Sequence, residues 1–119
     1  MHLQLPPHEH IKLVYVTHGE ILDVILDLRK NSNTFGEYLT IPITSYSNSL
    51  YIPKGCAHGF LTVSEEATVV YNVSTVYNPQ ADTGIKWDSF GFDWFGVRDP
   101  ILSERDHNFV NFKDFNSPF

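Results

Sequence analysis

The chain has 119 residues, which suits one compact domain, and we expect a single domain over residues 1–119. Eight Lys and Arg against fourteen Asp and Glu give a formal net charge of −6, so the chain has no general electrostatic attraction to nucleic acid or to an anionic membrane. An apolar fraction of 42% excludes an intrinsically disordered chain.

The sequence carries no sign of a membrane or secretory segment. No apolar run approaches the roughly 18 residues of a membrane span, and the first residues lack the basic region of a signal peptide. The single cysteine, Cys56, cannot form a disulfide within the chain, which suits a reducing compartment. We therefore expect a soluble, cytoplasmic protein.

Short segments rich in β-branched and aromatic residues recur along the chain, separated by turn residues such as His18-Gly19-Glu20 and Pro53-Lys54-Gly55. Their spacing is typical of an all-β sandwich or barrel. A helical turn is expected only near Ser103, which would cap it. The expected strands cover residues 12–16, 21–28, 38–44, 49–52, 60–63 and 67–73.

Residues 21–28 do not alternate strictly between apolar and polar side chains. Apolar residues occupy both odd and even positions, so we expect both faces of this strand to be covered. Asp23 and Asp27 interrupt the run, and we expect them to point outward or to accept local hydrogen bonds. The chain beyond Asn78 is rich in aromatic residues and is expected to pack against the body or a neighbouring copy. Together with the low share of charged residues, this tail favours a homodimer.

Two groups of residues are candidates for chemistry. The first, His8, His10 and His58, has the spacing of the histidines in a metal-binding cupin, although that signature also needs a Glu after the second His, where Val14 and Tyr15 occur instead. The alternative is that His8 and His10 are exposed loop residues.

The second group needs no metal and comprises His2, Lys12, His58, Tyr71 and Asp106. A histidine with a carboxylate partner is a general base near neutral pH. A lysine stabilises an enolate, and a tyrosine on the opposite wall returns a proton. Such a set is what inversion of a carbon next to a ketone requires. Alternation places Lys12, Val14 and Val16 on one face of their expected strand.

The sequence resembles the dTDP-4-dehydrorhamnose 3,5-epimerase family over nearly its whole length. The segments that carry the resemblance are His2-Leu3-Gln4, Lys12-Leu13-Val14, residues 19–24, residues 27–36 (DLRKNSNTFG), residues 52–60 (IPKGCAHGF), Tyr71, Tyr77-Asn78-Pro79, residues 85–88 and residues 100–106. The resemblance implies a cupin-like double-stranded β-helix, that is, a jelly-roll barrel, with a short irregular or helical C-terminal tail. It implies inversion at carbons next to the C4 ketone of a dTDP-4-keto-6-deoxyhexose in dTDP-rhamnose and polysaccharide biosynthesis, with no cofactor and no metal.

The resemblance also implies residue roles. His2 matches the general base, Asp106 the carboxylate behind it, and Tyr71 the catalytic acid. Lys12 and His58 match residues that line the sugar and its keto oxygen. Because the family's site is built from inward-facing strand residues, the resemblance predicts that Lys12, His58 and Tyr71 point into one shared cavity. The further substrate-binding positions are Gln4, Tyr77, Asp82 and Arg105, the last two near the nucleotide and its phosphates.

Several alternatives stay open at this point. Tyr71 could be a core aromatic, His58 a turn-bonding residue, Asp82 a solvated acid and Arg105 a surface cation. Family members carry a further segment before the position of His2, so the chain is expected to be a fragment, a late start or a short member. A sugar-nucleotide ketoisomerase, a non-catalytic sugar-nucleotide binding domain and a metal cupin are the competing functions.

Overall fold

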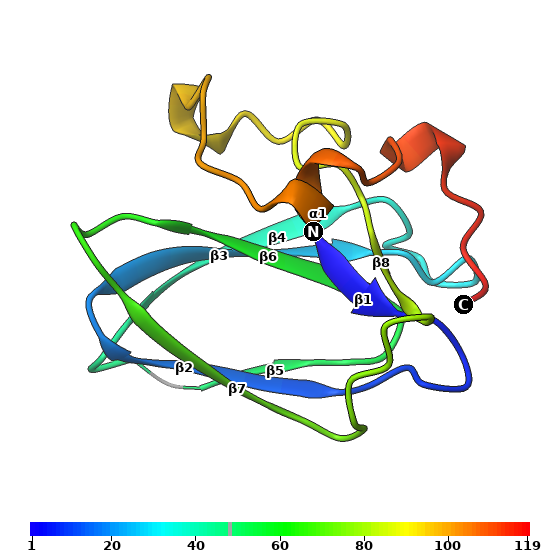
Figure 1. Ribbon diagram of the computed structural model, residues 1–119, viewed down its shortest axis with the longest axis horizontal. Helices are drawn as coiled ribbons and strands as arrows, with labels where there is room; N and C mark the ends of the chain where they lie inside the picture. Colours follow the sequence, from blue (N-terminus) through cyan, green and yellow to red (C-terminus); the bar gives the residue numbers. More distant parts are fainter. Residues whose placement is uncertain (48) are drawn as a thin grey trace.

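Two antiparallel β-sheets face each other in the computed structural model, which describes residues 1–47 and 49–119 (Figure 1). The larger sheet has the order β4-β3-β6-β1-β8, and the smaller has the order β5-β2-β7. The strands are β1 (His2–Gln4), β2 (Lys12–His18), β3 (Glu20–Asp27), β4 (Tyr38–Thr44), β5 (Leu50–Ile52), β6 (Cys56–Thr62), β7 (Thr68–Val73) and β8 (Asp82–Gly84). The expectation of an all-β jelly-roll barrel is confirmed.

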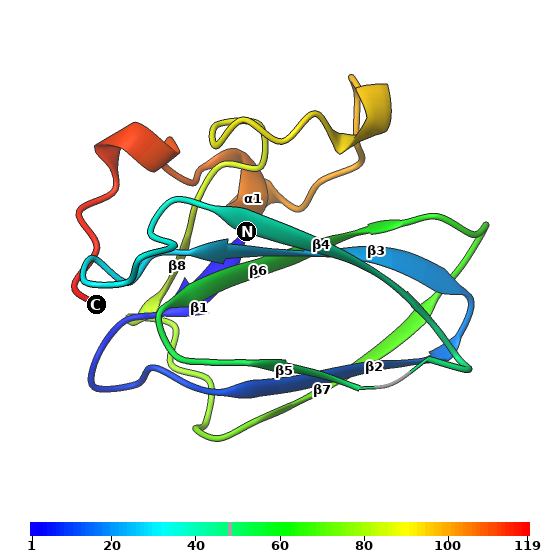
Figure 2. The ribbon, with the colours of Figure 1, turned by 180° about the vertical axis from the view of Figure 1, so that it is seen from behind.

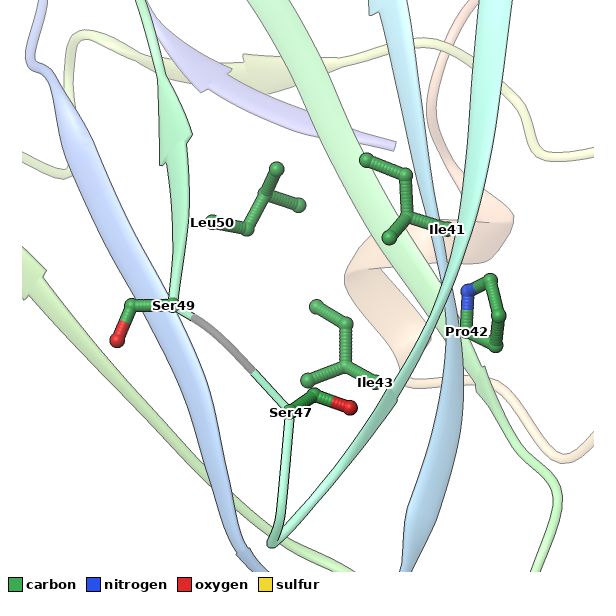
Figure 3. Close-up of a pocket in the computed structure, with 6 residues that line it drawn as sticks. All are labelled: Ile41, Pro42, Ile43, Ser47, Ser49 and Leu50. Atoms are coloured by element: carbon green, nitrogen blue, oxygen red, sulfur yellow. The ribbon is translucent and has the colours of Figure 1, made fainter.

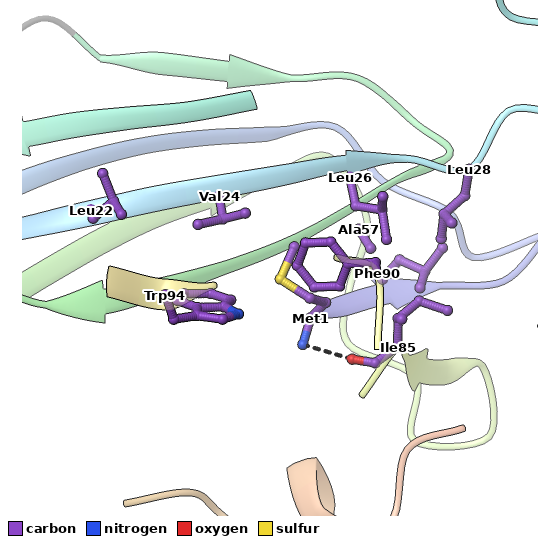
Figure 4. Close-up of a cluster of buried hydrophobic side chains, with 10 residues drawn as sticks. Met1, Leu22, Val24, Leu26, Leu28, Ala57, Ile85, Phe90 and Trp94 are labelled. Atoms are coloured by element: carbon purple, nitrogen blue, oxygen red, sulfur yellow. Dashed lines mark hydrogen bonds between the residues drawn. The ribbon is translucent and has the colours of Figure 1, made fainter. Parts of the chain in front are cut away.

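Strand β3 is buried on both faces, as its sequence predicts. Ile21 on its inner face packs between the sheets with Val16 of β2 and Ile43 of β4. The side chains at the alternate positions of β3 pack into an outer core, which the C-terminal segment covers (Figures 2 and 4). That outer cluster contains Met1, Leu3, Leu22, Val24, Leu26, Leu28, Ala57, Ile85, Phe90 and Trp94.

The six expected strands are all present, and two further strands were not predicted. β1 and β8 have three residues each, which is too short for an alternating pattern to be read. β6 also begins at Cys56, four residues earlier than expected, so His58 lies within a strand rather than in a turn. This difference matters because it places His58 directly opposite His2 in the β1–β6 pair.

The C-terminal segment lies across the outer face of the larger sheet (Figure 1). It contains the short helix α1 (Glu104–His107), with Ser103 as the predicted cap, because the Ser103 side chain accepts from the backbone N–H of Asp106. Two 3₁₀ turns that were not predicted, η1 (Trp94–Gly96) and η2 (Phe112–Asp114), flank it. Within residues 1–47 and 49–119, no helix has the length and apolar character that a membrane crossing needs.

Asp27, at the end of β3, accepts local hydrogen bonds as the sequence predicts. Its carboxylate receives two bonds from the Arg29 guanidinium at 2.9 and 2.8 Å and one hydroxyl bond each from Ser32 and Thr34 at 2.7 Å. The Arg29 side chain is the largest of the influences that hold the pKa of Asp27 far below its usual range. This cluster ties the loop after β3 to the sheet.

We predict that Asp27→Ala lowers the free energy of unfolding by about 2 to 3 kcal/mol at pH 7, because charge-assisted hydrogen bonds are lost and their donors are left unpaired. Because the pKa of Asp27 is depressed in the folded state, its contribution is complete above the unfolded value of 3.8 and declines progressively as the pH falls from 3.8 toward the lower folded value, so only part of it is lost at pH 3. Urea unfolding at pH 7 and at pH 3 measures both effects. The exposed Asp99→Ala is the control, and equal losses in the two variants would contradict the prediction.

Candidate active site

A cavity of about 1040 Å³ opens between the two sheets and continues beneath the C-terminal segment. It is bordered by β1, β2, β6 and β7 and by the chain around α1. All nine site residues that the sequence analysis names line it: His2, Gln4, Lys12, His58, Tyr71, Tyr77, Asp82, Arg105 and Asp106. Lys12, His58 and Tyr71 therefore share one cavity, as predicted.

Strand alternation explains this convergence. Lys12 begins β2 with the same parity as Val14 and Val16, which pack between the sheets. Tyr71 of β7 is the register partner of Val14, so its side chain lies on the same inner face. His2 of β1 and His58 of β6 are register partners in the facing sheet. Consequently two histidines on one wall face a lysine and a tyrosine on the other.

His2 forms a dyad with Asp106, since its Nε2 lies 2.7 Å from Asp106 Oδ1. The Ser103 hydroxyl donates to Asp106 Oδ2 at 2.5 Å and so orients the carboxylate from the helix cap. The ring of Phe109 packs edge-on against the imidazole, with 4.9 Å between ring centroids. The imidazole is therefore fixed on one side by a hydrogen bond and on the other by packing.

Burial lowers the pKa of His2, and the α-ammonium of Met1 lowers it further, against the opposing effect of Asp106. The imidazole is accordingly neutral at pH 7 and able to accept a proton. Burial alone would raise the pKa of Asp106, but the Ser103 hydrogen bond and the nearby positive groups outweigh it, so the pKa of this carboxyl lies below its usual value. An ionised carboxylate behind a neutral imidazole is the arrangement of a general base.

Lys12 is a buried cationic side chain of the cavity, with 7% of its surface exposed. Its Nζ donates to the backbone oxygen of His2 at 3.2 Å. Burial lowers the pKa of Lys12 to about 8, while Asp23 and Asp82 hold it up. The ammonium is thus charged at pH 7 and poorly hydrated, which strengthens its attraction for a developing negative charge.

His58 forms a second dyad, with Asp23, because its Nε2 lies 2.7 Å from Asp23 Oδ2. Both side chains are buried, and Asp23 has no exposed surface. The expectation that Asp23 points outward or bonds locally is wrong, since its partner is 35 residues away on the neighbouring strand. The signal in the sequence was the covering of both faces of this strand, which leaves Asp23 no solvent-facing side; in the structure it shares the parity of Ile21 and Ile25 between the sheets.

Tyr71 lies on the wall opposite His2, since β7 belongs to the smaller sheet and β1 to the larger one. Its side chain lines the cavity and 55% of its surface is exposed, so it is not a core aromatic. A base and a phenol that approach a ligand from opposite walls can exchange protons with opposite faces of one carbon.

Arg105 and Asp82 form an ion pair at the mouth of the cavity, with Nη1 2.6 Å from Oδ2. The same guanidinium nitrogen lies 3.4 Å from the hydroxyl of Tyr77. Half of the Arg105 side chain remains exposed, so the guanidinium is available to an anionic ligand.

Gln4 lines the cavity but has both ends of its amide occupied by backbone groups. Its Nε2 donates to the carbonyl of His8 at 2.7 Å, and its Oε1 accepts from the N–H of Asn78 at 2.7 Å. Gln4 therefore joins the loop after β1 to the loop after β7. Its contact with substrate stays a prediction.

The structure does not support the three-histidine metal hypothesis. His8 Nε2 lies 3.1 Å from the amide nitrogen of Asn78, and His58 is engaged by Asp23. Among residues 1–47 and 49–119, no group of three His, Cys, Asp or Glu side chains is placed to hold a metal ion.

A smaller cavity of about 340 Å³ lies between β4 and β5 (Figure 3). Ile41, Ile43 and Leu50 point into it. Pro42, Ser47 and Ser49 complete the lining. Since none of these side chains titrates near neutral pH, the larger cavity is the better candidate for catalysis.

A family model described as dTDP-4-dehydrorhamnose 3,5-epimerase matches residues 1–114. The chain belongs to this family. A 3,5-epimerase of Methanothermobacter thermautotrophicus is 46% identical over 102 residues, which cover 82% of this chain and 55% of the relative.

Solved structures agree with the sequence comparison. The Bacillus anthracis 3,5-epimerase with TDP and pyrophosphate bound superposes with a TM-score of 0.89 at 36% identity, covering 93% of this chain and 65% of that one. The Legionella pneumophila dTDP-6-deoxy-D-glucose-3,5-epimerase in complex with dTDP-4-keto-L-rhamnose gives 0.88 at 30% identity, covering 97% and 62%. The chain thus spans between 55% and 65% of the length of these relatives.

We predict that Lys12→Met raises the free energy of unfolding by about 1 to 3 kcal/mol at pH 7, because it removes the cost of burying a charge. Since the folded pKa is about 8 and the ordinary value 10.5, the unfolded chain binds more protons between these pH values, and wild-type stability rises with pH there. Urea unfolding at pH 7 and pH 10 should show the gain shrinking at the higher pH. The exposed Lys113→Met is the control, and a destabilised Lys12→Met at pH 7 would contradict this account.

Proposed function

We propose that this chain is a cofactor-independent epimerase that inverts carbon next to the C4 ketone of a dTDP-4-keto-6-deoxyhexose. The observation that carries the proposal is the placement of the His2–Asp106 dyad and Tyr71 on opposite walls of one cavity, with the Lys12 ammonium beside them. Membership of the 3,5-epimerase family supports the choice of substrate class.

The proposed reaction transfers one proton out and one proton in. The ketone acidifies the adjacent C–H bond, and His2 takes that proton while the C–H electron pair forms an enolate. The Lys12 ammonium holds the negative charge that develops on the C4 oxygen. Tyr71 then donates its phenolic proton to the other face of the carbon, and the C4 ketone is restored with the carbon inverted.

The distribution of charge along the cavity supports one orientation of the bound nucleotide sugar. Arg105 lies at one end, beside Tyr77, and offers a partly exposed guanidinium to the diphosphate. Glu65 and Glu66 line the cavity near the turn between β6 and β7 and would repel phosphate. We therefore place the diphosphate at Arg105 and the hexose between His2 and Tyr71.

We predict that His2→Asn abolishes exchange of solvent deuterium into the substrate at the carbon next to the ketone, a loss of about 10²- to 10⁴-fold. Tyr71→Phe should retain exchange but suppress inversion, because the proton leaves and returns on the side of His2. Lys12→Ala should slow both together. NMR of dTDP-4-keto-6-deoxyglucose in heavy water measures exchange and inversion separately.

The matched control is His18→Ala, which removes an exposed imidazole at the rim of the barrel. Binding of the substrate without any exchange would contradict the proposal and identify a sugar-nucleotide binding domain. Movement of the carbonyl along the sugar, with no inversion, would identify a ketoisomerase.

We infer further that the chain forms a homodimer through the outer face of the smaller sheet. Leu13 and Tyr51 are register partners there, and they are 40% and 59% exposed. This exposed apolar pair is the observation that supports placing the contact on that face. The single, buried Cys56 supports a cytoplasmic location for the assembly.

We predict that sedimentation of the wild-type chain at micromolar concentration gives the mass of a dimer. Leu13→Lys with Tyr51→Lys should shift it to a monomer, because two charges would be buried in the interface. Val63→Lys, at an equally exposed position after β6, should leave the dimer intact. A stable wild-type monomer would disprove the inference.

A further inference from the structure

Asp23 is a fully buried carboxylate for which the proposed reaction has no use. It lies in the middle of β3, with no exposed surface, among apolar neighbours of the inter-sheet core. One oxygen bonds to His58, whereas Oδ1 has no hydrogen-bond partner among the described residues. Burial of a half-satisfied carboxylate costs stability, so a specific gain elsewhere is needed to account for it.

The sheet register fixes the Asp23–His58 contact. Asp23 of β3 is opposite Phe60 of β6, and Ile25 is opposite His58, so Asp23 and His58 are diagonal neighbours on one face. This geometry brings the carboxylate to Nε2 of the imidazole, while the His58 side chain also lines the larger cavity, to which Asp23 does not contribute.

The protonation pattern follows from the surroundings. Burial lowers the pKa of His58, so its ring is neutral at pH 7, although Asp23 opposes this effect. The Asp23 carboxylate also lies near the Lys12 ammonium, whose pKa it raises against the effect of burial. A neutral imidazole beside a carboxylate places its single proton on Nε2 and leaves the lone pair of Nδ1 free for a ligand.

We propose that Asp23 is a positioning residue, which holds His58 as the Nε2–H tautomer and presents Nδ1 as an acceptor to a hydroxyl of the hexose. The proposal rests on the proposed function for the identity of the ligand. It assigns the C4 oxygen to Lys12 alone, because Nδ1 without a proton cannot donate to a ketone. His58 then selects sugars that carry a hydroxyl beside the reacting carbon.

The direct test is ¹⁵N NMR of the histidine side chains in the ligand-free wild-type chain at pH 7, with His58 assigned by loss of its signals in His58→Gln. We expect a protonated Nε2 and an unprotonated Nδ1. A proton on Nδ1 would overturn the proposal, and this measurement needs neither a variant of Asp23 nor any enzymatic activity.

Asp23→Asn supplies the second arm. An amide can donate to or accept from Nε2, so the His58 signals should shift to a mixture of tautomers. Asp27→Asn is the matched control, because it removes a carboxylate of the same strand and parity that bonds to Arg29 instead. An unchanged His58 tautomer in a folded Asp23→Asn variant would overturn the proposal.

The third arm is a double-mutant cycle on kcat/KM for epimerisation. Asp23→Asn should lower kcat/KM at least about tenfold in the wild-type background and cause no additional loss in the His58→Gln background. Equal losses in both backgrounds would show that Asp23 does not act through His58. If the wild type has no epimerase activity, the proposed function fails, while the NMR of the free chain still decides the role of Asp23.

Discussion

The pairing of β1 with β6 is the contact on which the candidate site depends. It consists of few residues, yet it makes His2 and His58 direct neighbours across two antiparallel strands, so that both imidazoles face the same space. β6 pairs on its other side with β3, which delivers Asp23 to His58. The adjacent α1 delivers Asp106 to His2. Each imidazole thereby obtains its own carboxylate from a different part of the chain.

The outer face of the larger sheet contributes mainly to stability, whereas the inner face carries residues of the candidate site. Its outer face carries an apolar cluster in which Val24, Leu26 and Ile85 have no exposed surface, closed by aromatic residues of the C-terminal segment (Figure 4). This cluster supplies hydrophobic free energy without polar interruption. The space between the sheets holds two smaller apolar clusters, and the polar side chains of Lys12, Asp23 and His58 are buried there as well. The fold tolerates these buried polar groups because the outer cluster stabilises it independently.

The barrel could be predicted because its long strands follow periodic patterns. The apolar residues at both odd and even positions of β3 also predicted that both of its faces are covered. Tyr71 and Lys12 were predictable as inward residues from alternation. The short strands β1 and β8 were not, since three residues carry no period. Asp23 was misassigned because an acidic residue in a strand is usually solvated, and only the register of β3 with β6 shows that its partner is His58. Motifs along the chain identified the family. The Asp23–His58 and His2–Asp106 contacts join residues 35 and 104 positions apart, and only the structure shows them.

The proposed mechanism requires the hexose to lie between a base on one wall and an acid on the other. The crystal structure of Tyr71→Phe with dTDP-4-keto-6-deoxyglucose bound tests this placement most directly, because the variant should bind the sugar without inverting it. We expect the C4 oxygen within about 3 Å of Lys12 Nζ and the carbon next to it facing the free nitrogen of His2, with the substituted ring at position 71 on the other side of the sugar. A sugar that lies outside the cavity, or one with His2 and position 71 on the same face of its ring, would contradict the mechanism.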